Sequence, residues 1–287
     1  AVDCLCWWSK RMAKPKVVCV VGTRPDAIKT APVVLELRRF ADSVDTVLVS
    51  TGQHREMLDQ ALGAFGLRAD HDLGIMRHGQ TLAEITVRSL EGLDALFCDL
   101  APDYVIAQGD TTTTFSAGLA AFYRRIPFGH VEAGLRTESV ANPFPEEFNR
   151  RSTGLVARDH FAPTQWAAQN LLDEGKSPER VFVTGNTGID AALYVARQDA
   201  EPWFPDRAGR MILLTTHRRE NWGEPQRRIA QSVAQILEAR PDVFVVAPMH
   251  KNPQVRDTLT RVLGDHPRAE LIEPPDYARF VKLMQRS

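Results

Sequence analysis

The sequence predicts an α/β protein with two doubly wound, Rossmann-like domains and a cleft between them. The chain has 287 residues, which exceeds the length that one hydrophobic core usually serves. Short apolar segments rich in β-branched residues alternate with helical patterns along most of the chain. Because such alternation is typical of parallel sheets covered by helices on both faces, we expect two sheets of this kind.

The first domain is expected over residues 16–198 and contains six predicted strands. These strands are 16–21, 45–50, 104–107, 128–131, 160–162 and 181–183. Helical patterns fill the gaps between them, for instance at 28–39 and 82–100. Residues 1–15 precede the first strand and are expected to be a non-native or disordered leader.

A charged segment with several prolines, 199–209, is predicted to link the domains. The alternation then starts again, and the second domain is expected over 210–287. Its predicted strands are 211–216, 243–247 and 269–272, and its predicted helices lie near 225–239, near 254–263 and at the end of the chain. In such sheets ligands bind outside the carboxyl ends of the strands, so the residues at those ends are the site candidates.

The composition narrows the possible classes of protein. Hydrophobic residues make up 44% and charged residues 25%, as in ordinary soluble domains. The net charge of −1 offers no general attraction to nucleic acid or to a membrane surface, so any anion site must be local. No segment is typical of a membrane span or a signal peptide, and a cytoplasmic location is therefore expected.

The four cysteines do not suggest a disulfide framework in a chain of this length. Cys4 and Cys6 form a C-x-C pattern, but no second ligand pair accompanies it, so no metal site is expected. Cys19 lies in the first predicted strand and Cys98 in an apolar helical pattern. Both are expected to act as small hydrophobes.

A glycine, a threonine, an arginine and a proline follow the first strand directly. Pro25 suits the first turn of a helix, and that helix start offers free N–H groups and a partial positive charge. Lys29 is placed to reach back toward Arg24, because helical side chains lean toward the N-terminus. Two cations at a helix start suit a phosphate-bearing ligand. The alternative, that both are solvated surface charges, is equally compatible with these residues alone.

Two common nucleotide-binding patterns are missing from this position. No G-x-G-x-x-G follows the first strand, and no acidic residue closes the second strand as a ribose-binding residue would. The chain also lacks a Walker A lysine motif. These observations argue against a nicotinamide dinucleotide, and no cofactor is expected.

Several acidic and basic residues follow later strands. Asp110 comes after the third strand, Glu132 and Arg136 follow the fourth, and Glu146, Glu147, Arg150 and Arg151 stand at a proline-rich helix start. Asp110 or Thr111 is also suited to cap a helix, and glutamates at a helix start usually pair with arginines one turn on. So many carboxylates on neighbouring loops nevertheless exceed what capping requires. In the second domain His217 follows the first strand and is predicted to face the cleft.

Seven motifs now support a resemblance that covers the chain from Lys16 to its last residue. In order, they are GTRPDAIK, TGQHREML, QGDTTT, HVEAGLRT, PEEFNR, the THRREN segment and PMHKNP. Together they resemble the non-hydrolysing UDP-N-acetylglucosamine 2-epimerases of bacteria. The resemblance implies a fold similar to the B-type glycosyltransferases. It also implies interconversion of UDP-N-acetylglucosamine and UDP-N-acetylmannosamine for cell-surface polysaccharide synthesis, without nicotinamide and by a homodimer.

The family reaction eliminates UDP across C1 and C2 to leave 2-acetamidoglucal, and then adds UDP back after reprotonation on the other face. By motif, the acid and base residues are Asp110, Glu132 and Glu146, with His217 assisting UDP departure. The substrate-binding positions are Arg24, Lys29, Arg136, Arg150 and Phe280, of which Arg136 and Arg150 are expected to hold the carboxylates in place. Which carboxylate serves which face stays open.

The sequence departs from the family pattern in two respects. Family members continue with further strands and a nucleotide-contacting loop, so the second domain is expected to be incomplete here. Some members are activated by substrate bound beside the active site, for which Gln53, Gln80 and His250 are the candidates. Gly79 stands before Gln80 where those members have arginine.

Three functions therefore remain open. The first is the epimerase. The second is a UDP-sugar glycosyltransferase of the same fold, which would need an acceptor groove but not three carboxylates together. The third is an inactive, truncated remnant.

Overall fold

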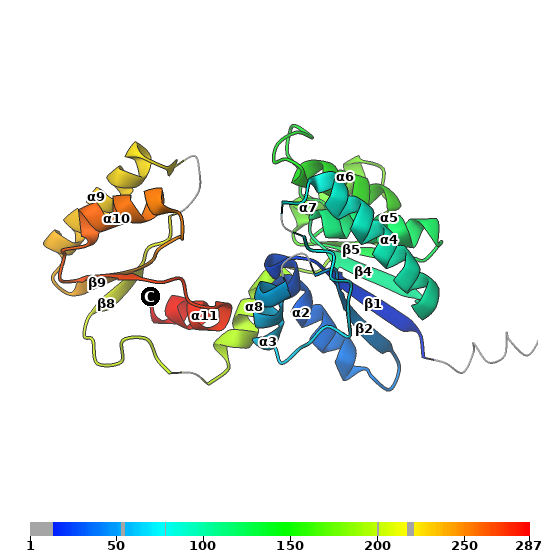
Figure 1. Ribbon diagram of the computed structural model, residues 1–287, viewed down its shortest axis with the longest axis horizontal. Coiled ribbons are helices and arrows are strands. Elements are labelled where there is room, and N and C mark those ends of the chain that lie inside the picture. Colours follow the sequence, from blue (N-terminus) through cyan, green and yellow to red (C-terminus); the bar gives the residue numbers. More distant parts are fainter. Residues whose placement is uncertain (1–13, 53–54, 78, 200, 217–220) are drawn as a thin grey trace, which may run out of the picture. The chain divides into compact units, whose positions relative to one another are not determined.

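The computed structural model describes residues 14–52, 55–77, 79–199, 201–216 and 221–287, without the side chains of residues 55–57. The chain forms two compact units that divide between Tyr194 and Val195. Each unit contains its own parallel sheet flanked by helices (Figure 1). The predicted α/β class with two parallel sheets is thus confirmed.

The first unit contains a sheet of seven parallel strands in the order β3-β2-β1-β4-β5-β6-β7. The strands are β1 (Lys16–Val21), β2 (Asp45–Ser50), β3 (His71–Asp72), β4 (Tyr104–Gln108), β5 (Phe128–Val131), β6 (Asp159–Ala162) and β7 (Val181–Val183). The sequence pattern predicts every one except β3. That strand is two exposed residues long, so it has no apolar run by which it could be recognised.

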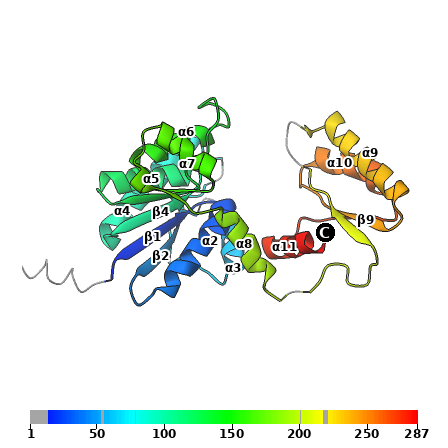
Figure 2. The ribbon, with the colours of Figure 1, turned by 180° about the vertical axis from the view of Figure 1, so that it is seen from behind.

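Helices cover both faces of this sheet. They are α2 (Arg24–Arg39), α3 (Arg55–Gly63), α4 (Leu82–Leu100), α5 (Thr112–Tyr123), α6 (Glu146–Val156), α7 (Gln165–Asp173) and α8 (Thr187–Ala196), with a short 3₁₀ turn, η1 (Pro178–Arg180), before β7. Helices α2, α3 and α8 lie on one side, and α4, α5 and α6 lie on the other (Figures 1 and 2). Helix α2 begins ahead of the predicted 28–39, because Thr23 caps it and Pro25 fits its first turn.

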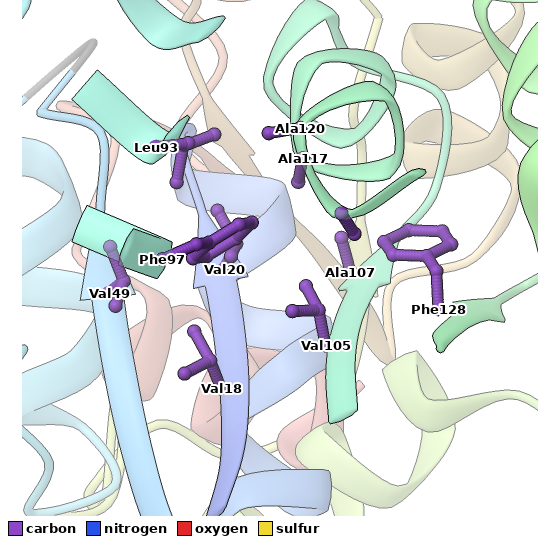
Figure 3. Packing of buried hydrophobic residues seen from close by; sticks show 11 residues of the cluster. Val18, Val20, Val49, Leu93, Phe97, Val105, Ala107, Ala117, Ala120 and Phe128 are labelled. Atoms are coloured by element: carbon purple, nitrogen blue, oxygen red, sulfur yellow. The ribbon is translucent and has the colours of Figure 1, made fainter. Parts of the chain in front are cut away.

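Alternate residues of the strands supply the two buried layers of the first unit. Val18 and Val20 of β1 pack with Phe97 of α4 and Phe128 of β5 (Figure 3). Cys19 points to the opposite face, beneath α2, and is fully buried as expected. Cys98 is exposed on α4, so the prediction that it acts as a core hydrophobe is wrong: the apolar face of α4 is instead supplied by neighbours such as Phe97.

The second unit contains a smaller parallel sheet in the order β10-β9-β8. Its elements are β8 (Arg210–Leu213), α9 (Glu224–Ala239), β9 (Val243–Pro248), α10 (Pro253–Leu263), β10 (Ala269–Ile272) and α11 (Tyr277–Arg286). Strand β8 pairs with β9 only as far as Leu213, so it is shorter than the predicted 211–216. Val245 of β9, Leu237 of α9 and Leu259 of α10 form the centre of its core.

None of the described helices combines the length and the apolar character that crossing a membrane would require.

Two buried histidines occupy register positions opposite one another in the first sheet. His130 of β5 is 1% exposed and His160 of β6 is 2% exposed. His130 Nε2 donates to the Gly109 carbonyl at 2.7 Å, because that oxygen can only accept. Burial is the main cause that lowers the pKa of each ring to about 4. Both rings are therefore neutral in the folded protein at neutral pH.

These histidines predict loss of stability in acid. Between pH 6.5 and about 4 the unfolded chain binds protons that the folded rings exclude. Stability is thus full above pH 6.5 and falls as the pH falls through this range, by on the order of 3 kcal/mol for each ring. His160→Gln should flatten the acid limb of a urea-unfolding series measured from pH 7 to 4.

The matched control is His71→Gln, which changes an exposed histidine of the same sheet. It should leave the acid limb as steep as in the wild type. Equal slopes in all three proteins would contradict the assignment of acid instability to the buried rings.

Candidate active site

The carboxyl edge of the first sheet has a topological switch point between β1 and β4. From β1 the chain continues to β2 on one side, whereas β4 is followed by β5 on the other. Open α/β sheets bind ligands in the crevice at such a point. Arg24 follows β1, Asp110 follows β4 and Glu132 follows β5, so these predicted residues lie on neighbouring loops at this edge.

The best-defined contact in this region joins Lys29 to Glu132. Lys29 Nζ donates to both carboxylate oxygens, at 2.8 and 2.7 Å. The Gln108 side-chain amide, at the end of β4, donates to the same carboxylate. The Glu132 side chain is only 12% exposed and that of Lys29 is 32% exposed. One predicted cation and one predicted acid/base residue are thus held together in a largely enclosed position.

The backbone of Glu132 is unusual. Its φ of +64° lies in the left-handed region, which residues other than glycine rarely adopt. The neighbouring backbone supports it, because Ala133 N donates to the Phe161 carbonyl and Asn170 Nδ2 donates to the Gly134 carbonyl. A sharp, well-supported turn of this kind aims the carboxylate back over the ends of β4 and β1.

Gly134 allows this turn to pack against α7. Its φ is +87°, and a Cβ at this position would lie 2.1 Å from the Ala167 carbonyl oxygen. Any side chain here would have to displace the backbone of α7. The loop that holds Glu132 is therefore fixed by α7 as well as by the sheet.

Asp110 belongs to a second network at the same edge. Arg150 Nη2 donates to its carboxylate at 2.6 Å, and Asn149 Nδ2 donates to its backbone carbonyl at 2.9 Å. The role predicted for Arg150, orienting an acid/base carboxylate, agrees with this contact. Thr111 rather than Asp110 caps α5, which leaves the Asp110 side chain to Arg150.

Glu147 pairs with arginines one turn along its own helix, as glutamates at a helix start usually do. It is fully buried and pairs with Arg150 at 3.2 Å and with Arg151 at 2.6 Å, one turn along α6. Its neighbour Glu146 is partly exposed, and forms no hydrogen bond or ion pair with the described residues. The same holds for Arg24, which is exposed at the start of α2.

Arg136 does not hold any of the predicted acid/base carboxylates. Its Nε and Nη2 donate to the two carboxylate oxygens of Glu174, at 2.6 and 2.7 Å. These hydrogen bonds are the main cause that lowers the pKa of Glu174. The expected contact with the carboxylates is thus corrected: the guanidinium ties the loop after Glu132 to the end of α7.

The residues that support these loops were not predicted from the sequence. Gln108, Asn170 and Glu174 each donate to or accept from the segment around Glu132. Asn170 and Glu174, the residue that caps the end of α7, are four positions apart, a spacing that places two side chains on the same side of a helix. The four-residue spacing can be seen in the sequence, but the sequence does not show that these side chains contact the segment around Glu132.

The remaining predicted residues belong to another loop of the first unit, to the second unit, or to the part of the chain outside the described residues. Gln80 is bonded within its own loop, to Arg77 N and to the Ile75 carbonyl. In the second unit Phe280 lies half-buried on α11, and His250 is exposed after β9. His217 and Gln53 lie outside the described residues. Within the described part of the chain, no group of three His, Cys, Asp or Glu residues is placed to hold a metal ion.

The fold of this chain is shared with a known class of proteins. A solved glycosyltransferase from Rickettsia africae shares this fold with a TM-score of 0.56, covering 96% of this chain and 71% of that one, at 12% identity. The likeness agrees with the predicted glycosyltransferase B-like architecture of two parallel-sheet units.

The family is more specific. A family model described as UDP-N-acetylglucosamine 2-epimerase matches residues 36–287, and the chain belongs to that family. The UDP-N-acetylglucosamine 2-epimerase of Bacillus subtilis is 50% identical over 278 residues, which are 96% of this chain and 73% of that protein. A crystal structure of UDP-GlcNAc 2-epimerase from Neisseria meningitidis bound to UDP-GlcNAc is 44% identical, with a TM-score of 0.81 over 95% of this chain and 76% of that one.

The packing of Gly134 predicts a large loss of stability on substitution. Gly134→Ala places a Cβ in the left-handed region, at about 1–2 kcal/mol, and forces it against the α7 backbone, at about 1–3 kcal/mol more. Gly175→Ala is the matched control, because Gly175 has a φ of +80° and open space around its absent Cβ. Urea unfolding followed by circular dichroism should show the larger loss for Gly134→Ala. Equal losses would contradict the close packing on α7.

Proposed function

We propose that this chain interconverts UDP-N-acetylglucosamine and UDP-N-acetylmannosamine by inverting the configuration at C2. The observation that carries the proposal is the pair of contacts Lys29–Glu132 and Arg150–Asp110 on adjacent loops at the switch point. Two carboxylates, each held by a cation, suit a reaction that moves protons beside an anionic leaving group. Membership of the epimerase family supports the same conclusion.

The proposed reaction begins with an elimination. A carboxylate takes the proton from C2, the C2–H electron pair forms the C1–C2 double bond, and the C1–O bond breaks. UDP leaves with the electron pair of that bond, and 2-acetamidoglucal remains. Return of a proton to the other face of C2, together with addition of UDP to C1, gives the epimer. The proton on C2 is poorly acidic, so fixed positive charge near the departing pyrophosphate is needed.

Asp110, Glu132 and Glu146 are the proposed acid and base residues, and each stands at the carboxyl edge or at the start of α6. Arg150 orients Asp110 through their 2.6 Å contact. Lys29 is proposed to hold Glu132 in the free enzyme and to share its charge with the pyrophosphate when substrate binds. Arg24, exposed at the start of α2, adds a second cation for that group.

Further roles are proposed for residues other than these carboxylates and cations. His217 assists UDP departure, and Phe280 contacts the uridine. Gln53, Gln80 and His250 are proposed for a regulatory site. These roles are implied by the resemblance to the epimerase family, and the cytoplasmic location and the supply of cell-surface polysaccharide synthesis stay predictions in the same way.

A homodimer is also proposed, and an apolar surface on α5 and α6 supports it. Phe115, Leu119 and Phe122 recur at helical spacing on α5, and the Phe148 ring of α6 lies 5.8 Å from that of Phe115. Leu155, farther along α6, is 78% exposed, and Phe122 is 58% exposed. Exposed apolar residues gathered on two packed helices are typical of a protein interface.

Glu132→Gln should abolish exchange at C2. The amide cannot accept the proton, whereas nucleotide affinity should stay within about tenfold, roughly 1.4 kcal/mol. The protein is incubated with UDP-N-acetylglucosamine in heavy water, and deuterium at C2 is followed by NMR. Calorimetry with UDP measures binding.

Glu91→Gln, an exposed change on α4, is the control and should exchange like the wild type. Deuterium incorporation by Glu132→Gln at the wild-type rate would remove Glu132 from the acid/base set. A wild-type protein that incorporates no deuterium, or that transfers the sugar to an acceptor, would overturn the proposed function.

A further inference from the structure

Asp26 is a buried carboxylate that the proposed reaction does not use. It lies in the first turn of α2 and is 3% exposed. Its Oδ2 atom accepts from Gly22 N at 3.3 Å, from Thr23 N at 3.1 Å and from Thr111 Oγ1 at 3.0 Å. The first two donors belong to its own loop. The third belongs to the loop after β4, on the other side of the switch point.

Helix capping alone does not account for this arrangement. Asp26 and Thr23 form a capping box on α2, and Glu84 and Thr81 form the same box on α4. Glu84 is exposed, and among the described residues it accepts only from Thr81. Asp26 is instead buried, and burial is the main cause that raises its pKa to about 6. A capping carboxylate that is exposed, as that of Glu84 is, would avoid the cost of burying a charged group.

The surrounding threonines keep the loops in direct contact. Gly22 has no room for a side chain, because a Cβ would lie 2.0 Å from Thr113 Oγ1. Thr113 Oγ1 in turn lies 3.1 Å from Thr51 Oγ1, beyond the end of β2. Thr111 both donates to Asp26 and caps α5 by accepting from Thr114 N. The segments at the ends of β1, β2 and β4 are thus joined by hydrogen bonds. Asp26 is the acceptor in the hydrogen bond that links the segment after β1 to the segment after β4.

We propose that Asp26 is a positioning residue that locks the loop after β1 to the loop after β4 and so fixes Arg24 relative to Asp110. Arg24 lies two residues before Asp26, and Asp110 lies one residue before Thr111. The inference rests on the proposed function, in which Arg24 meets the pyrophosphate and Asp110 moves a proton. Departure of UDP from C1 and proton transfer at C2 require both groups at set positions on one substrate. Small misplacements of such groups are costly to rate.

Asp26→Ala is the first test. It removes the shared acceptor, and kcat should fall by about 10–100-fold while KM changes by much less, since no substrate contact is removed. Asp26→Asn keeps an oxygen that the three donors can use and should recover most of kcat. Glu84→Ala removes the equivalent helix cap on α4 and should leave kcat unchanged.

Thr111 supplies a second test that is independent of the folding of Asp26→Ala. Thr111→Val loses the hydroxyl and should lower kcat, whereas Thr111→Ser keeps it and should not. If the two residues act as one link, the double variant Asp26→Ala/Thr111→Val should be no slower than the slower single variant.

These assays distinguish failure of the positioning role from failure of the proposed function. An active wild type with unchanged kcat in Asp26→Ala, or with fully multiplicative effects in the double variant, would overturn the positioning role and leave the proposed function standing. A wild type without deuterium incorporation at C2 would overturn the proposed function and this inference with it.

Discussion

The ion pair between Lys29 and Glu132 holds together distant segments at the carboxyl edge of the first sheet. It joins residues 103 positions apart, one on the helix after β1 and one on the loop after β5. Strand β4 lies between these two strands in the sheet, and its last residue, Gln108, donates to the same carboxylate. A single carboxylate thereby ties the carboxyl ends of three adjacent strands. Because the pair is largely enclosed, it is less screened than a surface ion pair would be.

The surrounding structure offsets the strain that this arrangement requires. Glu132 adopts a left-handed backbone, and strained residues of this kind persist only where their neighbours determine them. Here Gly134 packs on the α7 backbone, Asn170 bonds the Gly134 carbonyl, and Arg136 ties the end of the loop to Glu174. Asp110 is held in a comparable way by Arg150 and Asn149. Glu132 and Asp110 are therefore each paired with a cation, whereas Glu146 forms no ion pair with the described residues.

Most of the fold could be predicted from local sequence patterns. Apolar runs rich in valine predicted β1 and β2 with their observed bounds, because buried parallel strands need continuous apolar runs. β3 has no such run, and β8 ends earlier than its apolar pattern because pairing with β9 ends. The positions of Asp110 and Glu132 after their strands were also predictable, since parallel strands bring their carboxyl ends to one edge.

The pairing of side chains was not predictable in the same way. Nothing local indicates that Lys29 reaches Glu132, that Arg136 turns to Glu174, or that Thr111 bonds Asp26, because each contact joins segments far apart in the chain. The left-handed backbone of Glu132 has no sequence mark either, since glycine is the usual residue there. The sequence motifs thus predicted which residues belong to the candidate site. The structure was needed to show that some of them, such as Arg136, hold the loops.

The most direct measurement is the steady-state epimerase rate of Lys29→Met. A fall in kcat of about 10²–10³-fold is expected, because the substitution removes a fixed cation from Glu132 and, in the proposed reaction, from the departing pyrophosphate. Lys16→Met is the matched control; it changes a lysine at the amino end of β1, at the opposite edge of the sheet, and should keep the wild-type kcat. A Lys29→Met enzyme with unchanged kcat would show that this ion pair does not organise the site.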